Sequence, residues 1–162
     1  MAETLGSLVD KLSIKVIRGY FMTEMLQQKE TKFPKSEIEE KLKRLQEQKD
    51  TLQEEIEDFV CAAAEGRVTL RDEKLKLYNK PEVMGKTAGL KTVAQAIEAL
   101  TAKNLELWRL EDEARREDVP LSFIGEVKRK IDVTNQQRND YIDRIDELLA
   151  QEIAHRQHGT KK

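Results

Sequence analysis

Two stretches of this chain, 89 residues apart, place their apolar side chains at the same alternating spacings of four and three residues. This spacing puts one apolar stripe along a single face of an α-helix, which is the heptad pattern of helices that pack side by side. One position of the pattern carries a cation in both copies, Lys49 in the first and Arg138 in the second. The two stripes are Ile38, Leu42, Leu45, Lys49, Leu52, Ile56 and Phe59, and Val127, Ile131, Thr134, Arg138, Tyr141, Ile145 and Leu148. The repeat predicts an all-α protein.

The segments that precede the two stripes also match each other, at a shift of 88 residues. The stretch "LSIKVIRGY" at 12–20 aligns with "LTAKNLELW" at 100–108, which sets Trp108 against Tyr20. A P-x-S turn stands before each stripe, where two helices would be joined. We therefore predict a tandem duplication of one antiparallel helical hairpin.

The helices of the two hairpins are expected at about 5–28, 36–63, 88–117 and 122–156. All 162 residues then form one domain, with a first hairpin at about 5–63, a second at about 88–156 and a tail at 157–162. The linker at 64–87 carries signals for a short helix over 70–78, and it either seals the end of the bundle or covers a ligand. One hairpin alone leaves part of its stripe uncovered, so we expect an intramolecular four-helix bundle, with a dimer of long hairpins as the alternative.

Composition and charge narrow the classes of partner. Charged residues make up 37% of the chain and aromatic residues 5%, a profile typical of long helices. The 29 basic and 31 acidic side chains nearly cancel, so no long-range attraction to nucleic acid or to anionic membranes is expected. No stretch approaches the ~18 consecutive apolar residues of a membrane span. A single cysteine and an acidic start without an apolar run favour the cytoplasm.

Polar residues enter the apolar stripe of the third predicted helix. Asn104 and Glu111 occupy positions where the first hairpin has Val16 and Thr23, and Arg115, one turn beyond Glu111, can pair with it. Most of the other charged residues of "NLELWRLEDEARRED" map to the outward face of that helix, namely Arg109, Asp112, Glu113 and Arg116. Trp108 lies beside the stripe, where it is interpreted as a packing anchor.

Counting outward from the loop near residue 119 sets Asn104 opposite Asn135, and Arg138 opposite Thr101. Buried polar groups need hydrogen-bond partners, so we expect these four residues to form one network. Glu111 and Arg115 would lie at its loop end. Such a network fixes the register of the helices, or binds a ligand or partner, or takes part in catalysis.

Other constellations carry less information. The acids of "EEIED" and "DYIDRIDE" have the E-x-x-E and D-x-x-D spacing of magnesium-dependent all-α nucleotide pyrophosphohydrolases, but they map to the outside of the predicted bundle: Glu54, Glu57, Asp143 and Asp146. The single "EIAH" at 152–155 is half of what a di-iron bundle requires. We find no Gly-rich phosphate loop and no Ser/His/Asp or Cys/His set, and we predict no metal and no cofactor.

The second hairpin resembles a family of uncharacterised small bacterial helical proteins with the motif L-W-x-x-E-D-x-A-R followed by K-R-x-I-D-x-x-N-x-x-R-N-D. The residues here that match it are Leu107, Trp108, Glu111, Asp112, Ala114, Arg115, Lys128, Arg129, Ile131, Asp132, Asn135, Arg138, Asn139 and Asp140. Arg109 stands where that family often has histidine. The first hairpin, with "LVDKLSIK", is similar to the opening of a second uncharacterised family, and the similarity continues into "KLKLYN".

Both resemblances imply an association with bacterial gene clusters for surface glycans and glycosyltransferases. The motif includes stripe residues and also outward ones, among them Asp112, Asp132, Asn139 and Asp140, which folding alone explains less well. The candidates for ligand or partner contact are Asn104, Trp108, Glu111, Asp112, Arg115, Asn135, Arg138, Asn139 and Asp140. We favour a non-enzymatic interaction or accessory module with a protein partner or a second copy in a homodimer. The alternative is a metal-dependent hydrolase or binding protein for nucleotides or nucleotide-sugars that uses the Glu/Asp sets.

Overall fold

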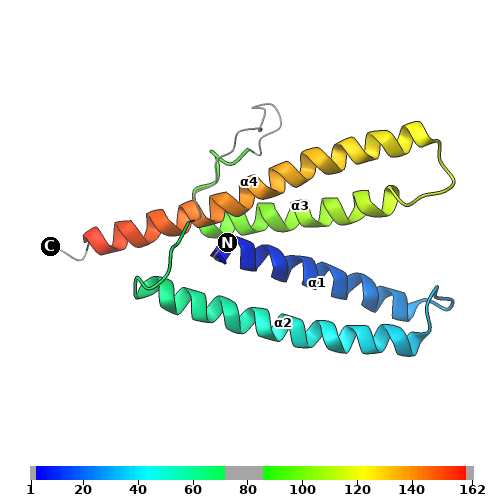
Figure 1. The fold of residues 1–162 in the computed structure, drawn as a ribbon, viewed down its shortest axis with the longest axis horizontal. Helices are drawn as coiled ribbons and strands as arrows, with labels where there is room; N and C mark the ends of the chain where they lie inside the picture. The colour runs from blue at the N-terminus through cyan, green and yellow to red at the C-terminus, as the bar shows by residue number, and fades with distance from the viewer. Residues whose placement is uncertain (1–2, 72–85, 160–162) are drawn as a thin grey trace.

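The computed structural model describes residues 3–71 and 86–159, and these contain four α-helices and no strand (Figure 1). The helices are α1 (Leu5–Gln27), α2 (Lys35–Ala64), α3 (Val93–Glu113) and α4 (Leu121–Gly159). Helices α1 and α2 form hairpin 1, and α3 and α4 form hairpin 2. The prediction of an all-α bundle of two antiparallel hairpins is therefore confirmed. Most of the short helix expected at 70–78 lies outside the described residues.

The two hairpins begin with the same local device. Thr4 caps α1 in a capping box with Ser7, and Thr92 caps α3 in a capping box with Gln95. The two caps are 88 residues apart, which is the shift found between the matching sequences. The cap also explains why α3 begins at Val93 and not near residue 88 as predicted, because the chain before Thr92 is still in a loop.

Helix α1 is the central element of the bundle. It packs against α2 within its own hairpin and also against both α3 and α4, whereas α2 packs chiefly against α1. The hairpins lie close together where α1 begins and diverge toward their loops (Figure 1). Among the described helices, a third member therefore lies over both helices of hairpin 2 but not over both helices of hairpin 1.

The main core lies at the end of the bundle where the hairpins converge. All four helices contribute to it, and the most deeply buried side chains are Leu100 of α3 and Ile145 of α4. The described end of the linker also packs there, through Val68 and Leu70. Toward its loop, hairpin 2 has a smaller core of its own, built on Leu107, Val127 and Ile131.

The first turn of α1 lies directly against the backbone of α4. A Cβ added at Gly6 would meet the Ile142 carbonyl oxygen at 2.3 Å, so only glycine permits this approach. The Gly6 amide donates a hydrogen bond of 2.8 Å to the Asp146 carboxylate, which satisfies one of the unpaired amides at the helix N-terminus.

Two acids that the sequence predicts to point outward are buried in the structure. Asp146 is 2% exposed and Asp140 is 4% exposed, so the prediction of an outward position is wrong for both. The heptad pattern assigned faces relative to α3 alone. The first turn of α1 covers Asp146, on a face of α4 that this pattern leaves open.

Candidate functional site

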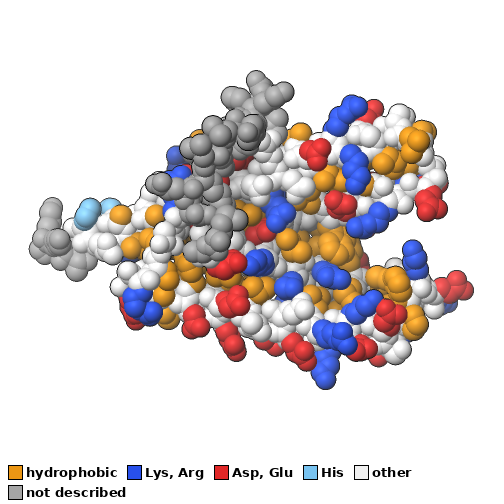
Figure 2. Space-filling model, in the orientation of Figure 1, with side chains coloured by type: hydrophobic (Ala, Val, Ile, Leu, Met, Phe, Trp, Pro, Cys, Tyr) orange, Lys and Arg blue, Asp and Glu red, His pale blue; other side chains and the backbone are white. Residues whose placement is uncertain are grey.

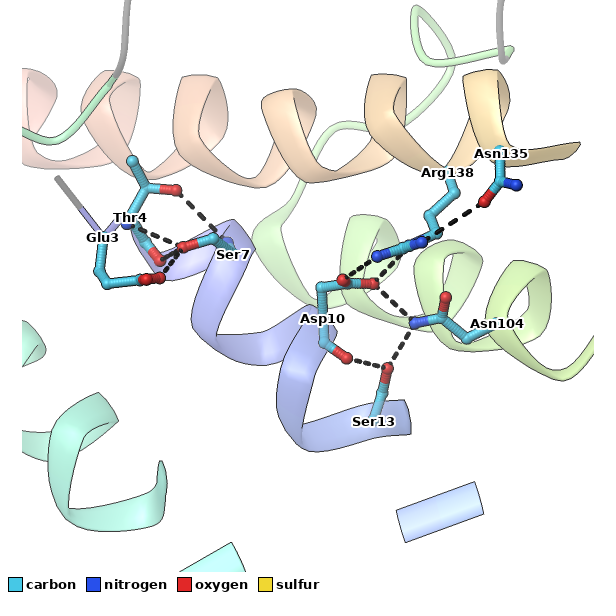
Figure 3. A network of polar contacts seen from close by, with 8 residues as sticks. All are labelled: Glu3, Thr4, Ser7, Asp10, Ser13, Asn104, Asn135 and Arg138. Carbon is cyan, nitrogen blue, oxygen red and sulfur yellow. Dashed lines mark hydrogen bonds and ion pairs between the residues drawn. The ribbon is translucent and has the colours of Figure 1, made fainter. Parts of the chain in front are cut away.

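A buried carboxylate on α1 connects hairpin 1 to both helices of hairpin 2. Asp10 is 4% exposed, and its Oδ1 accepts hydrogen bonds from Arg138 Nε at 2.9 Å and from Asn104 Nδ2 at 2.8 Å. Its Oδ2 accepts a third, from an Arg138 terminal nitrogen at 2.5 Å (Figure 3). Arg138 and Asp10 thus form a two-pronged ion pair, the strongest geometry for these groups.

Two more side chains complete this arrangement, which we name the Asp10 network: Asp10, Ser13, Asn104, Asn135 and Arg138. Asn104 Nδ2 also donates to the Ser13 hydroxyl at 2.6 Å, and that hydroxyl donates to the Asp10 backbone carbonyl at 3.0 Å. The second terminal nitrogen of Arg138 makes a long contact of 3.4 Å to Asn135 Oδ1. Helices α1, α3 and α4 all contribute (Figure 3).

The structure brings together three of the four residues of the predicted network. Asn104, Asn135 and Arg138 lie together, but Thr101 is exposed and its hydroxyl donates to the Ile97 carbonyl of its own helix. Asp10 takes the place opposite Arg138 that was assigned to Thr101. The prediction for Thr101 is wrong because only hairpin 2 was considered, and the counter-charge comes from hairpin 1.

Asp10 is the member that the sequence reasoning missed. It directly follows two apolar residues in "LVDKL" and shares a helix face with Ile14 and Ile17, an unusual place for an acid in an amphipathic helix. A lone cation in an apolar stripe, such as Arg138, also calls for an acid elsewhere in the chain. The two signals are complementary, since one is an acid and the other a cation. Their pairing across 128 residues nevertheless depends on how the hairpins dock.

A cavity of about 260 Å³, which we name the junction cavity, adjoins the Asp10 network. Its lining comes from α1, α3 and α4, and comprises Ile14, Asn104, Leu107, Trp108, Glu111, Arg115, Asn135 and Arg138. Six of the nine candidates from the sequence are in that lining. Figure 2 shows apolar side chains gathered at the back of the gap between the two hairpin loops.

The tryptophan in this lining is held by an aromatic contact between the hairpins. Trp108 of α3 stacks on Phe21 of α1, with ring centroids 5.5 Å apart and planes 4° apart. The neighbouring Tyr20 packs edge-on against Phe21 and is 61% exposed. Trp108 is thus a packing anchor, as predicted. Its partner is Phe21, the residue next to Tyr20, and the repeat aligns Trp108 with Tyr20.

The other three candidates do not line the junction cavity. Asp112 is exposed and pairs with Arg115 at 3.2 Å, which replaces the pairing of Arg115 with Glu111 that was predicted. Asn139 is exposed, and Asp140 is buried.

The charges around the junction cavity are unevenly compensated. Asp10 cancels the charge of Arg138, and Asp112 offsets that of the more exposed Arg115. Glu111 is partly buried and makes no ion pair or hydrogen bond within residues 3–71 and 86–159. Its carboxylate is the one charge of the lining that lacks an opposite partner in that part of the chain.

The lining limits the chemistry that this site can perform. Among the described residues it has one carboxylate and no histidine, cysteine, serine or lysine, so a paired acid and base or an activated nucleophile is not assembled there. What it offers is a set of fixed hydrogen-bonding groups beside an apolar wall. Groups of this kind are typical of ligand-binding pockets.

The acids proposed for a metal site are dispersed. Glu54 and Glu57 are exposed on α2, and Asp146 is held by the Gly6 amide. In the described part of the chain, no three His, Cys, Asp or Glu side chains group closely enough to hold a metal ion. Glu152 of the "EIAH" stretch pairs with Arg156.

A larger hollow of about 500 Å³ lies elsewhere, between the first turn of α1 and the end of α2. It contains none of the predicted candidates, and the charged residues around it, such as Glu55, Asp58 and Arg67, are exposed. Arg67 already pairs with the exposed Glu65. The junction cavity, with a buried network behind it, is the better candidate site.

No described helix has the length and apolarity needed to cross a membrane. Comparison with curated proteins and with solved structures finds no match. One family model does match, over residues 1–71 and 94–162, and these two segments coincide with hairpin 1 and hairpin 2. The chain belongs to the family described as "Protein of unknown function (DUF4254)".

Proposed function

We propose that this chain is a non-catalytic binding module and that the junction cavity is its binding site. One observation carries the proposal. The Asp10 network holds Asn104, Asn135 and Arg138 from behind, while the same three side chains line an open space. Side chains fixed in this way are preorganised for a ligand, because they lose little freedom when it binds.

A purely structural role for the network accounts for less of the site. Fixing the register of helices requires only that polar groups satisfy one another. Glu111 lies in the same lining without a partner among the described residues, which adds nothing to register. A ligand or a partner group that reaches Glu111 accounts for both features.

The size of the junction cavity sets the scale of the ligand. Pockets for drug-sized molecules measure ~300–1,000 Å³. At about 260 Å³, this one suits a single small ring or one unit of a longer molecule. The rest of a longer ligand would lie outside, in the gap between the hairpin loops (Figure 2).

The proposal includes a cellular setting and a partner. The gene-cluster association implied by the sequence resemblance supports an accessory role in surface-glycan synthesis in the bacterial cytoplasm. Val16 and Tyr20, one helical turn apart on α1, are 51% and 61% exposed, which supports contact with a protein partner or with a second copy.

The test is thermal stability of the purified protein with and without magnesium, against a panel of nucleotides, nucleotide-sugars and free sugars. A ligand at 100 times its Kd stabilises a protein by about 2.7 kcal/mol, or roughly 5–10 °C for a chain of this size. We expect one panel member to give such a shift without magnesium. Glu111→Ala should abolish it, and Glu98→Ala, an exposed acid on the same helix, should not.

Two outcomes would overturn the proposal. Magnesium-dependent turnover of a nucleotide or nucleotide-sugar, lost on Asp143→Ala, would make the chain an enzyme of the alternative class. Indifference of the wild-type protein to every member of the panel would leave the junction cavity without a small-molecule ligand.

A further inference from the structure

The charges of the junction cavity argue against an anionic ligand. Phosphate sites concentrate donors around positive charge that nothing else cancels. Here both oxygens of Asp10 engage Arg138, and Asp112 pairs with Arg115. A phosphate group in the cavity would also face the Glu111 carboxylate at close range, and like charges repel strongly where water is partly excluded.

A cationic ligand is also a poor fit. Glu111 and the face of Trp108 would attract an amine. Arg115 and Arg138 line the same small space, however, and their guanidinium groups have only N–H donors, so neither can accept a hydrogen bond from the amine. The lining is best matched by a ligand without net charge.

The lining has both a hydrogen-bond acceptor and a hydrogen-bond donor left free. Asn104 uses its Nδ2 group to donate to the Asp10 carboxylate and to Ser13. The Asn104 Oδ1 atom is therefore left as a free acceptor, and it accepts no hydrogen bond from the described residues. Asn135 faces Arg138 with its oxygen, which leaves its Nδ2 as a donor. Figure 3 shows the Asn104 oxygen turned away from Asp10 and Ser13, and the Asn135 nitrogen turned away from Arg138.

Hydroxyl groups satisfy such a mixed lining. Each hydroxyl both donates and accepts, so a row of them can meet Glu111, Asn104 Oδ1 and Asn135 Nδ2 in turn. The remaining wall is apolar, formed by Ile14, Leu107 and Trp108, the last of which is fixed by its stack on Phe21. A saturated ring with hydroxyls on its edge and C–H groups on its face presents both surfaces.

We infer that the junction cavity binds an uncharged ring with several hydroxyl groups, of the size of one sugar unit, and that it discriminates against the same ring bearing phosphate. This inference rests on the proposed function and names the ligand class of that site. Glu111 selects for the neutral ligand, and Asp10 does so indirectly by cancelling the charge of Arg138.

The experiment compares neutral monosaccharides (glucose, galactose, mannose and N-acetylglucosamine) with their 6-phosphates and with inorganic phosphate, by ligand-observed NMR on the full chain. We expect at least one neutral sugar to bind and its 6-phosphate to bind at least about tenfold more weakly. Glu111→Ala should lower the affinity for the neutral sugar by about tenfold. The matched change Glu98→Ala should leave its affinity unchanged.

Two variants test the role of charge directly. Glu111→Gln keeps the shape of the side chain and removes its charge, so it should narrow the preference for the neutral sugar over the phosphate. Asp10→Asn leaves the charge of Arg138 uncompensated and should narrow the preference for the neutral sugar still more. Circular dichroism checks that this variant is folded. If only Glu111→Gln folds, that variant alone tests the inference: a narrower preference for the neutral sugar supports it, and an unchanged or wider preference contradicts it.

The failures of the inference and of the proposed function are distinguishable. If sugar phosphates or free phosphate bind better than the neutral sugars, and Glu111→Ala changes that binding, the site stands and the ligand class is wrong. If no neutral sugar binds at tens of millimolar while a nucleotide stabilises the protein, the inference alone falls. If no probe of either panel binds, both are overturned.

Discussion

Residues that share a position in the two hairpins lie in different surroundings. Val16 of α1 is 51% exposed, whereas Asn104, its counterpart 88 residues later in α3, is 4% exposed. Lys49 of α2 bonds to the neighbouring Gln46 on the surface, whereas its counterpart Arg138 of α4 pairs with buried Asp10. The two hairpins share a pattern and a cap, but not an environment.

The difference comes from α1, which serves both hairpins. It is half of hairpin 1, and its other side covers α3 and α4. The polar positions of hairpin 2 therefore face a third helix, which supplies Asp10 and Ser13 as partners. Among the described helices, none lies over both α1 and α2 in this way, and the equivalent positions, Val16 and Lys49, meet solvent. A duplicated hairpin can carry a buried polar site in one copy only, because packing two copies together makes their surroundings unequal.

The largest effect that this comparison predicts is for the cation at the shared position. Arg138→Leu leaves the Asp10 carboxylate buried without its partner and should destabilise the fold by on the order of 3 kcal/mol, or about 10 °C in Tm. Lys49→Leu should change stability by less than about 0.5 kcal/mol, because Lys49 bonds only to a neighbour on the surface. Thermal and urea unfolding of both variants measure the contrast. Equal effects would mean that Asp10 does not depend on Arg138.

The next largest effect concerns the place where hairpin 1 meets hairpin 2. Gly6→Ala puts a methyl group against the Ile142 carbonyl and disturbs the bond to Asp146, at a cost of roughly 1–3 kcal/mol. The control is Gly125→Ala in the second turn of α4, where nothing lies within 4 Å of the added carbon. It should be neutral or stabilise by up to about 1 kcal/mol.

Urea unfolding of the two alanine variants decides the point. A stable Gly6→Ala protein would show that α1 does not approach α4 as closely as described. The assignment of α1 as the shared helix would then lose its main support.

Helix periodicity was enough to predict the hairpins and their order. The spacing of four and three residues fixes which side of each helix meets its hairpin partner, and the P-x-S turns mark the loops. Periodicity relative to one partner says nothing of the opposite face. Asp146 is predicted to point outward for this reason, and the docking of α1 buries it. Asp140 is buried on another side of α4, which the pattern also leaves open.

The same limit applied to the site. Asn104, Asn135 and Arg138 were recognised as polar residues in an apolar stripe, which is a local signal. Asp10 was not paired with them, because its distance from Arg138 is set by the packing of one hairpin on the other.

A smaller effect on stability, with a larger one on binding, is expected when the charged network is removed as a whole. The variant Asp10→Leu, Asn104→Val, Arg138→Leu copies the apolar character of Val16 and leaves no buried charge unpaired. Its stability should lie within about 1 kcal/mol of the wild type, because apolar replacements of buried ion pairs are often neutral. Sugar binding by NMR should be lost. A stable variant that still binds would separate the ligand site from the Asp10 network.

The smallest effect distinguishes the two capped N-termini, where hairpin 1 has Glu3 and hairpin 2 has Lys91 at the same position. The Lys11 ammonium and the Ser7 hydroxyl, each 2.6 Å away, hold the pKa of the Glu3 carboxyl below its usual range. A lowered pKa in the folded state means that Glu3 stabilises the fold above the unfolded pKa, about 4.3, and that this contribution is lost as the pH falls through the folded pKa. Glu3→Gln should therefore lower the free energy of unfolding at pH 7 by well under about 1 kcal/mol, because Glu3 and Lys11 are half exposed, and Tm should fall slightly with it. Near pH 2 the substitution should have no effect. An equal difference in Tm at both pH values would assign the effect to the shape of the side chain and not to its charge.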